Sequence, residues 1–468
     1  MFNIINSKLG ESRGKPRIWV EGEMLSPVFN YGDKLSIEID SKTKRLVFYP
    51  SKTPNTKLSV SKRVNPKTKK VKPLIEIKDE RIAQLFNVGN LLRIVLTNGK
   101  AVVSLHGNKQ QEQERLDRII SKVKNKTPLA VGSLFAGAGI LDAAIKEGFK
   151  KTAIALQTAL VIEREPAYLS QFLKNHRASL APNACVLQSE IQDVEIKKGV
   201  KLDMLVIGLP CTAASQAGYT KNALKEKGGA EAHDDAGDLF FYFLQQVKLC
   251  QPAIIKFECV PQYEKTAGYI VIKSVLSTFG YDIQDRIVSG NEFGDLENRE
   301  RLCMVATTTG LNDLIKFDIN DIPATNKKPD SIAPYILEVD PESEEWKEYD
   351  YLVTKEVSDK AKGSGFKRDI YTGNETKVTT IRRLYHKGGS CDQYLAHPTK
   401  PNLWRKFRAV EHGAFKGVPA YLYEGLSETI AHECLGQSIT FNTFVDVAKR
   451  FSERLGTLLT MPEHKIAA

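Results

Sequence analysis

The sequence lacks the features of a secreted, zinc-binding or membrane protein. Its 468 residues include only seven cysteines, an odd number, and no two of them form a Cys-x-x-Cys pair. This argues against a disulfide framework and against a zinc site of common spacing, and it fits a reducing compartment. No stretch approaches the roughly 20 apolar residues of a membrane span, and residues 1–8 lack a signal-peptide core. We therefore expect a cytoplasmic protein with no membrane association, in which a free thiol is available for chemistry.

Acidic residues are scarce in the first quarter of the chain. Residues 1–126 hold 26 lysines and arginines against 12 acidic residues, net +14, whereas residues 127–468 hold 41 against 44, net −3. The formal charge of +11 therefore belongs to the N-terminal part. An excess this local predicts attraction to phosphate, the alternative being a basic face that is only solvated.

The basic N-terminal part contains an internal duplication. Residues 15–22 align with residues 72–79 at an offset of 57, and Gly32 then falls on Gly89. Each copy alternates apolar and polar residues around a glycine turn, which predicts a small β unit that buries one face against its twin. We assign residues 1–108 to one duplicated all-β module. The pattern resembles the swapped-hairpin folds of AbrB-type transcription regulators and SymE-type proteins, and the resemblance implies a DNA-binding domain.

Between the two copies lies a segment rich in lysine and proline. We interpret it as a mobile basic loop beside DNA, the alternative being a plain linker. Its cations are Lys52, Lys57, Lys62, Arg63, Lys67, Lys69, Lys70 and Lys72. After the second copy, apolar residues at helical spacing predict a connecting helix over residues 109–127.

From residue 128 onward the chain has an α/β pattern. Short apolar segments alternate with helical stretches, which specifies a mostly parallel sheet covered by helices, as in a Rossmann-like domain. We assign residues 128–309 to this domain. Residues 310–404 form a less regular insertion with no helix expected before residue 405, and residues 405–468 complete the domain.

Cys211 is the strongest candidate for a catalytic residue. The apolar segment 204–207 leads into Pro210-Cys211 and then into small and polar residues that include Ser215 and Gln216. A strand that delivers a cysteine onto such a turn presents a nucleophile, whereas most of the other cysteines lie in apolar or helical runs that predict core packing.

The first α/β strand leads into a glycine turn that suits a nucleotide cofactor. Glycines there let the backbone approach a ligand, and the following helix offers unpaired N–H groups, although a structural turn is the alternative. The next strand ends in Glu163, placed to bind a ribose diol, and the third is followed by Glu190-Ile191, placed to meet an adenine. The turn residues of this predicted site are Phe135, Ala136, Gly137, Gly139 and Ile140.

Four further motifs follow in a distinctive order. They are Gly-Asp-Leu-Phe at residues 237–240, Phe-Glu-Cys-Val-Pro at 257–261, Asn-Arg-Glu-Arg-Leu at 298–302 and Leu-Gly-Gln-Ser-Ile at 435–439. Together with residues 405–419 they resemble the DNA cytosine-5 methyltransferase family, over about residues 129–456. The resemblance implies a Rossmann-like methyltransferase domain that uses S-adenosyl-L-methionine and needs no metal.

The resemblance also implies a role for each motif. A Cys211 thiolate would add to C6 of a flipped-out cytosine, Glu258 would act at N3, and Arg299 and Arg301 would flank the site. Pro210, Gln437 and Ser438 would join the cofactor site. Residues 310–404 would be the target-recognition region. The residues expected to contact DNA are Ser215, Gln216, Lys221, Arg382, Arg383, Tyr385 and Lys387.

The sequence departs from the usual family pattern at several positions. Cys259 is the most consequential, because it replaces an asparagine and a thiol largely lacks the hydrogen-bonding capacity of an amide. The others are Ser133, Glu190, Glu297 and Gln437.

We expect double-stranded DNA as the partner, in a nucleoid-associated enzyme of a prokaryotic or phage-infected cell. The enzyme would either work beside a cognate restriction endonuclease or stand alone. The alternatives are a tRNA or RNA cytosine-5 methyltransferase and a non-catalytic DNA-binding regulator with the same fold.

Overall fold

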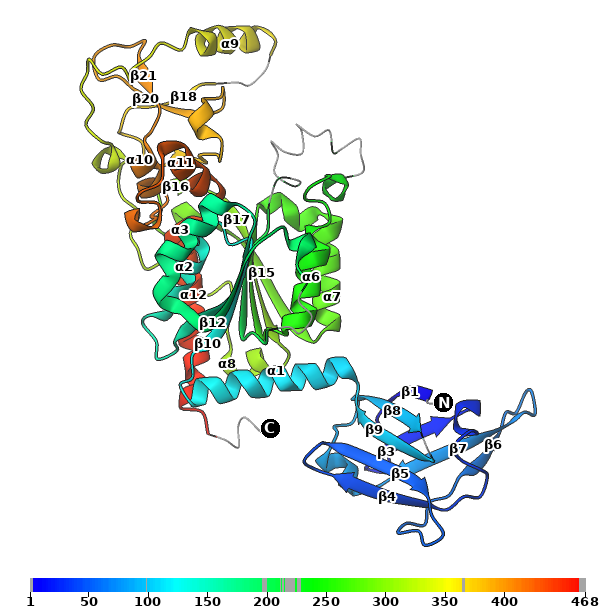
Figure 1. Ribbon diagram of the computed structural model, residues 1–468. Helices are drawn as coiled ribbons and strands as arrows, with labels where there is room; N and C mark the ends of the chain where they lie inside the picture. Colours follow the sequence, from blue (N-terminus) through cyan, green and yellow to red (C-terminus); the bar gives the residue numbers. More distant parts are fainter. Residues whose placement is uncertain are drawn as a thin grey trace. The chain divides into compact units, whose positions relative to one another are not determined.

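The computed structural model describes residues 3–97, 99–195, 200–210, 212, 214, 224, 229–363 and 367–462. The chain divides into two compact units, Met1–Glu114 and Arg115–Ala468 (Figure 1). Within the described residues, no helix combines the length and apolar character required to cross a membrane.

The first unit is built from strands up to Leu105. Its strands are β1 (Asn3–Lys8), β2 (Gly10–Ser12), β3 (Lys15–Glu21), β4 (Leu35–Asp40), β5 (Arg45–Pro50), β6 (Ser61–Val64), β7 (Val71–Lys78), β8 (Leu91–Thr97) and β9 (Lys100–Leu105). They form one sheet in the order β1-β8-β9-β5-β4 and another in the order β2-β3-β7-β6. Alternate residues such as Ile18, Val20, Ile75 and Ile77 are buried in a shared core, as the period of two in the sequence predicts.

The strand registers agree with the duplication seen in the sequence. β3 pairs with its counterpart β7 so that Trp19 lies opposite Glu76, its own equivalent at the offset of 57. β5 pairs with its counterpart β9, where Leu46 faces Val103 and Val47 faces Val102. Each repeat therefore pairs with its twin about a local twofold axis. Both glycine turns also match, because Gly32 and Gly89 have φ angles of 84° and 91°.

The basic segment between the repeats is more ordered than the sequence indicated. Residues 61–64 form β6, which pairs antiparallel with residues 71–74 of β7. The interpretation as a loop is therefore wrong for residues 61–64 and 71–72, because exposed polar strands of a two-stranded ribbon leave no apolar alternation to detect.

The predicted connecting helix is α1 (Gly107–Lys124). In the second unit its Arg118 and Lys122 bind the buried carboxylate of Asp203 at 3.0 and 2.5 Å. Asp203 also accepts a hydrogen bond from the amide of Ala130, so it holds the helix, the start of β10 and the start of β13 together.

The second unit contains a sheet of seven strands in the order β12-β11-β10-β13-β14-β17-β15. Their bounds are β10 (Leu129–Leu134), β11 (Leu156–Glu163), β12 (Leu180–Gln188), β13 (Met204–Gly208), β14 (Ile254–Cys259), β15 (Tyr281–Ser289) and β17 (Glu300–Thr308). The first five in this order are parallel, and β17 is antiparallel to both neighbours. The predicted mostly parallel sheet is thus present.

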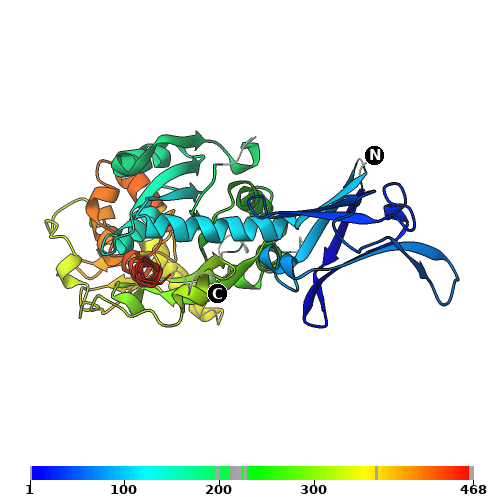
Figure 2. The ribbon, with the colours of Figure 1, turned by 90° about the horizontal axis from the view of Figure 1, so that it is seen from below.

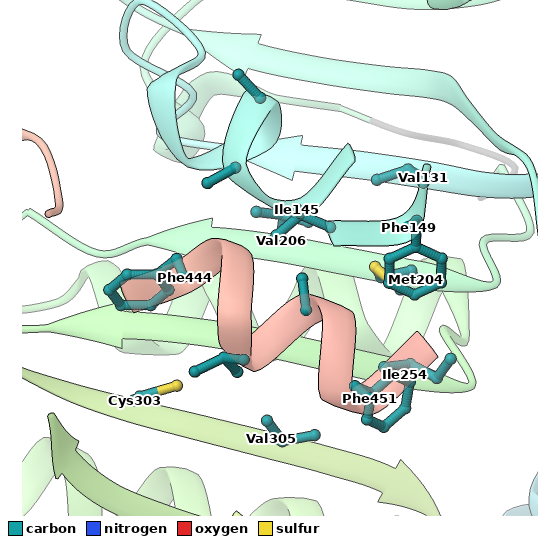
Figure 3. Packing of buried hydrophobic residues seen from close by; sticks show 14 of the residues in the cluster. Val131, Ile145, Phe149, Met204, Val206, Ile254, Cys303, Val305, Phe444 and Phe451 are labelled. Carbon is teal, nitrogen blue, oxygen red and sulfur yellow. The ribbon is translucent and has the colours of Figure 1, made fainter. Parts of the chain in front are cut away.

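Helices cover both faces of the sheet. They are α2 (Ile140–Phe149), α3 (Pro166–His176), α6 (Leu239–Cys250), α7 (Ala267–Thr278) and α12 (Phe441–Gly456). Along β13, Met204 and Val206 pack with α2 and α12, whereas Leu205 and Ile207 pack with α6 and α7. Figure 3 shows the first of these cores, and Figure 2 views α12 nearly along its axis. A strand buried on both faces explains the continuous apolar run in the sequence.

The insertion has a small core of its own and more structure than expected. It contains α9 (Asp350–Ala361), β18 (Asp369–Tyr371), β19 (Val378–Thr379), β20 (Gln393–Ala396) and β21 (Trp404–Arg405), and β19 pairs with β16 (Glu297–Asn298). The expectation of no helix before residue 405 is wrong. α9 buries only Leu352, so it lacks the apolar face that reveals a helix in a sequence. The remaining helices are α8 (Leu311–Ile315), α10 (Ala409–Phe415) and α11 (Glu428–Gln437).

Candidate active site

Several of the predicted site residues lie where the parallel strands end. β10, β11, β13 and β14 run in the same direction, so their carboxyl ends share one edge of the sheet, where α/β proteins bind ligands. A β-carbon at Gly208 would lie 3.7 Å from Oε2 of Glu258 and 3.9 Å from the carbonyl oxygen of Phe135. The end of β13, the glycine turn and Glu258 therefore meet at this edge.

The glycine turn has the strained backbone that its sequence suggests. Phe135, Gly137 and Gly139 have φ angles of 54°, 54° and 81°. A larger residue at position 139 would require neighbouring atoms to move, because a β-carbon there would lie 2.4 Å from Nε2 of His176. This histidine Nε2 lies 2.9 Å from the carbonyl oxygen of Gly139, while Lys146 Nζ lies 3.0 Å from Nδ1. Burial and Lys146 lower the pKa of His176 to about 3, so a neutral ring supports the turn from behind.

Glu163 fixes the same turn from the next strand. Its Oε2 accepts a hydrogen bond from the Gly137 amide at 2.7 Å, and its Oε1 accepts one from the Glu165 amide at 2.9 Å. The side chain is buried, and this burial raises its pKa. Two backbone amides already bound to the carboxylate give Glu163 a structural role in addition to the predicted ribose contact.

The other predicted cofactor residues differ in their surroundings. A β-carbon at Gly137 would lie 3.9 Å from Nε2 of Gln437, so the motif at the end of α11 reaches the glycine turn. Ser438 instead donates to the carbonyl of Leu435 at 2.8 Å. Glu190 is exposed and pairs with Arg164 at 3.1 Å, and Ile191 beside it is buried. Pro210 is half-buried.

Glu258 and Arg301 form a buried ion pair at the centre of the site. Arg301 Nε lies 2.8 Å from Glu258 Oε1, and both side chains are at most one-tenth exposed. Burial raises the pKa of Glu258, while Arg301, Arg299 and Lys416 oppose the rise. A carboxyl with a raised pKa can carry a proton at a pH where an exposed glutamate is ionised, which is the property that a general acid requires.

Arg299 joins the site to the end of α11. Its Nη2 donates to the carbonyl of Gly436 at 2.8 Å. On its other side Gly436 packs directly on the insertion, because a β-carbon there would lie 2.4 Å from the Arg382 carbonyl and the Arg383 amide nitrogen. Gly436 therefore connects an active-site arginine with the predicted DNA-reading segment.

A buried polar cluster that the sequence did not reveal lies behind Arg299. Lys416 Nζ and Arg299 Nη1 lie 3.2 and 3.4 Å from Oε1 of Glu297. Burial and Arg299 lower the pKa of Lys416 to about 7. His412 adds a third group near Glu297, and its Nδ1 lies 3.1 Å from Nδ1 of His432. The departure at Glu297 was visible in the sequence, but its partner Lys416 lies 119 residues away.

Cys259, at the end of β14, makes one hydrogen bond to the segment before Pro210. Its buried Sγ donates to the carbonyl of Leu209 at 3.6 Å, and the Leu209 amide donates to the carbonyl of Glu258 at 3.1 Å. The thiol therefore provides one weak donor contact to the segment that carries Pro210.

The predicted DNA-contacting residues lie in different surroundings. Ser215, Gln216 and Lys221 lie outside the described residues, as does the predicted nucleophile Cys211. Lys387 is exposed, whereas Arg382 pairs with the buried Asp392 at 2.6 Å and Arg383 donates to the Tyr168 hydroxyl at 3.0 Å.

The prediction that Tyr385 contacts DNA is wrong. Tyr385 is fully buried, and its hydroxyl donates to the carbonyl of Gln393 at 2.6 Å. Its ring also packs against His432, with centroids 5.0 Å apart. A tyrosine inside a basic cluster looks exposed in the sequence because its packing partners are distant residues.

Comparison with known sequences identifies the family of the second unit. The family described as C-5 cytosine-specific DNA methylase matches residues 129–453. The type II methyltransferase M.NlaX of Neisseria lactamica is 24% identical over 330 residues, covering 69% of this chain and 96% of the relative. M.Bsp6I of a Bacillus species is 29% identical over 181 residues, covering 38% of this chain, and the chain spans about half (51%) of that relative.

Solved structures share the fold. A methyltransferase of Entamoeba histolytica, EhMeth, aligns with a TM-score of 0.51 at 18% identity, covering 70% of this chain and 98% of its own. The Dnmt2 methyltransferase of S. pombe aligns with a TM-score of 0.50 at 17% identity, covering 71% and 98%. Because the family match covers most of the chain, the protein belongs to the C-5 cytosine-specific DNA methylase family.

Proposed function

We propose that the protein methylates C5 of cytosine in duplex DNA with S-adenosyl-L-methionine as the methyl donor. The buried ion pair of Glu258 and Arg301 is the main support for this proposal. It lies beside Gly208 at the end of β13, and Gly208 precedes Cys211 by three residues. A nucleophile, a carboxyl with a raised pKa and two arginines are the groups that activation of a cytosine ring requires.

The glycine turn suits the cofactor. A β-carbon at Gly137 would meet no atom closer than 3.9 Å, so the backbone there is open to a ligand. Gln437 lies beside this turn, and the exposed Glu190, which pairs with Arg164, lies at the neighbouring strand end. When bound there, S-adenosyl-L-methionine supplies a methyl group on a sulfonium.

The residues of the chain activate the base. The Cys211 thiolate adds to C6 of a cytosine that has left the helix, and the ring electrons move toward N3, where Glu258 donates its proton. Arg301 holds the Glu258 carboxyl in place. C5 then takes the methyl group, with S-adenosyl-L-homocysteine as the leaving group, and the C5 proton passes to water. Elimination of the Cys211 sulfur from C6 as a thiolate restores the aromatic ring as Glu258 recovers its proton from N3.

Replacement of Cys211 with alanine should abolish methyl transfer, because it removes the thiol proposed to form the bond to C6. The measurement is incorporation of labelled methyl groups from S-adenosyl-L-methionine into duplex DNA, with identification of the methylated base. Cys391→Ala is the matched control, since Cys391 is an exposed cysteine of the insertion, and it should retain wild-type transfer. A Cys211→Ala protein that still produces 5-methylcytosine would contradict the mechanism. The same assay with tRNA as the acceptor distinguishes a DNA methyltransferase from an RNA methyltransferase.

Replacement of Gly436 with alanine should reduce turnover by about a hundredfold, because a misplaced catalytic group costs that much. The new β-carbon would lie 2.4 Å from the backbone of Arg382, so the carbonyl that binds Arg299 must move. Gly456→Ala is the control, since a β-carbon there meets nothing within 4 Å. Steady-state kinetics on duplex DNA test this prediction, and equal turnover of the two variants would refute it.

Further assignments are part of the same proposal. Residues 310–404 would recognise the target sequence, with Arg382, Arg383 and Lys387 reaching DNA. The N-terminal module would bind DNA as a tandem swapped-hairpin domain. Relatives named as type II methyltransferases and as a phage orphan methyltransferase, M.Rho11sI of Bacillus phage rho11s, support both a restriction-modification partner and a solitary role. Sequencing of methylated bases in DNA from cells expressing the protein reports the recognised site.

A further inference from the structure

The local twofold axis of the N-terminal unit places two equivalent hairpins at opposite edges of one sheet. The sheet order β2-β3-β7-β6 puts β2 beside β3 and β6 beside β7, the twin of β3. The first hairpin turns tightly at Arg13 and Gly14. The second is longer and turns through residues 65–70. We call residues 61–72 the basic ribbon.

The basic ribbon carries more cations than the first hairpin. It holds six cations and no acidic residue, and all of them are exposed: Lys62, Arg63, Lys67, Lys69, Lys70 and Lys72. In the first hairpin, by contrast, Lys15 and Arg17 pair with Glu80 and Glu76 at 2.9 and 2.8 Å. Among the residues that the structure describes, the four lysines from 67 to 72 form no ion pair. Their charge is therefore available to an external partner.

The tip of the ribbon is held in one conformation. Asn65 Oδ1 accepts hydrogen bonds from the amides of Lys67 and Thr68 at 2.9 and 3.0 Å. The Asn65 amide donates to the carbonyl of Lys70, and the Lys69 amide donates to the carbonyl of Asn65, both at 2.9 Å. A turn fixed in this way loses little conformational entropy when its lysines bind.

Aromatic residues and an acid support the base of the ribbon. Arg63 lies 5.0 Å from the Trp19 ring centroid and pairs with Glu21 at 2.6 Å, and Lys62 lies 5.3 Å from the Tyr31 ring centroid. Beyond this base, Val64 and Val71 are 54% and 40% exposed. A ribbon that projects with unpaired cations at its tip and uncovered apolar sides lacks a partner within its own unit.

We propose that the basic ribbon is an arm that binds duplex DNA in the major groove. A two-stranded antiparallel ribbon fits the width of that groove, and its lysines reach the phosphates on either side. The arm anchors the protein on DNA independently of the base that the catalytic unit modifies, so it contributes affinity rather than turnover.

The test compares two triple variants of the full chain. One replaces Lys67, Lys69 and Lys70 with glutamine. The control replaces Lys42, Lys44 and Arg45 with glutamine, which removes the same charge from the exposed turn of the β4–β5 hairpin. Binding to duplex DNA that lacks cytosine target sites is measured over a series of salt concentrations, and thermal melting checks that both variants fold.

The ribbon variant should bind DNA about two orders of magnitude more weakly than the wild type near 0.1 M salt. The slope of log K against log salt concentration should become less steep by about 2.7, the value expected for three lost phosphate contacts. The control should bind nearly as the wild type. Equal losses in both variants, or no loss in either, would overturn the proposal. Double-stranded RNA has a deep major groove that excludes a ribbon. The ribbon substitutions should therefore weaken binding to double-stranded RNA much less than binding to DNA, and an equal loss of affinity for both would contradict groove binding. Methyl transfer at saturating DNA should be unchanged, so a failure of the catalytic proposal would be visible separately.

Discussion

Replacing Lys256 with methionine should stabilise the protein, and the gain should depend on pH. Lys256 lies on β14 and is 5% exposed, and its Nζ has no hydrogen-bond partner among the described residues. The ring centroid of Phe451 lies 3.7 Å from this nitrogen. Burial lowers the pKa of Lys256 from 10.5 to about 7. Folding therefore disfavours the protonated ammonium of Lys256, which is fully hydrated in the unfolded chain.

The sign of the effect follows from this lowered pKa. Below pH 7 the lysine is protonated in both states, and the wild type bears the full penalty of roughly 4–5 kcal/mol. As the pH rises from 7 toward 10.5, the folded protein binds fewer protons than the unfolded chain, and the penalty falls by about 1.4 kcal/mol per pH unit. Methionine removes the penalty at every pH while filling a similar volume.

Urea unfolding of the wild type and Lys256→Met at pH 6.5, 8 and 9.5 measures this difference. The stability gap should be widest at pH 6.5 and should narrow steadily at higher pH. Lys248→Met on α6 is the control, because Lys248 is exposed and its replacement should change stability little. If the difference in unfolding free energy between Lys256→Met and the wild type were the same at all three pH values, the pKa of Lys256 would not be lowered by folding.

Replacing Glu258 with glutamine should lower the rate of methyl transfer by about 10²- to 10⁴-fold, the usual contribution of a general acid. Glutamine has nearly the same shape and can still accept a hydrogen bond from Arg301, but it has no proton to give to N3. Binding of DNA and cofactor should change much less than the rate, because the lost interaction forms mainly in the transition state.

Single-turnover methyl transfer from labelled S-adenosyl-L-methionine tests this prediction. Glu300→Gln is the matched control, since Glu300 is exposed on β17 between the two site arginines. It should react at nearly the wild-type rate. If Glu258→Gln reacted as fast as Glu300→Gln, the carboxyl at position 258 would have no role in proton transfer.

Local sequence patterns were sufficient for the parallel strands and for placing several predicted site residues at one edge of the sheet. Each apolar run from β10 to β14 is followed by glycine, proline or a carboxylate, and parallel strands bring these ends together without further information. For this reason Gly137, Glu163 and Glu258 could be assigned to one edge before their geometry was known.

Features that depend on distant contacts could not be predicted. The pair of Glu297 and Lys416 forms across 119 residues, and nothing near Lys416 in the sequence indicates that its charge is buried. Tyr385 looked exposed because its neighbours are basic, yet its packing partner His432 comes from α11. α9 has too small an apolar face for a periodic pattern to reveal it.

The covalent link between the two N-terminal repeats has a consequence for assembly and for divergence. When two separate chains each supply one half of a fold, its stability depends on protein concentration and every substitution appears twice. Here both halves belong to one chain, so the unit folds in a first-order process at any concentration. A change can also enter one half alone. The single elongated hairpin with six cations is an asymmetry that a symmetric pair of identical chains could not acquire.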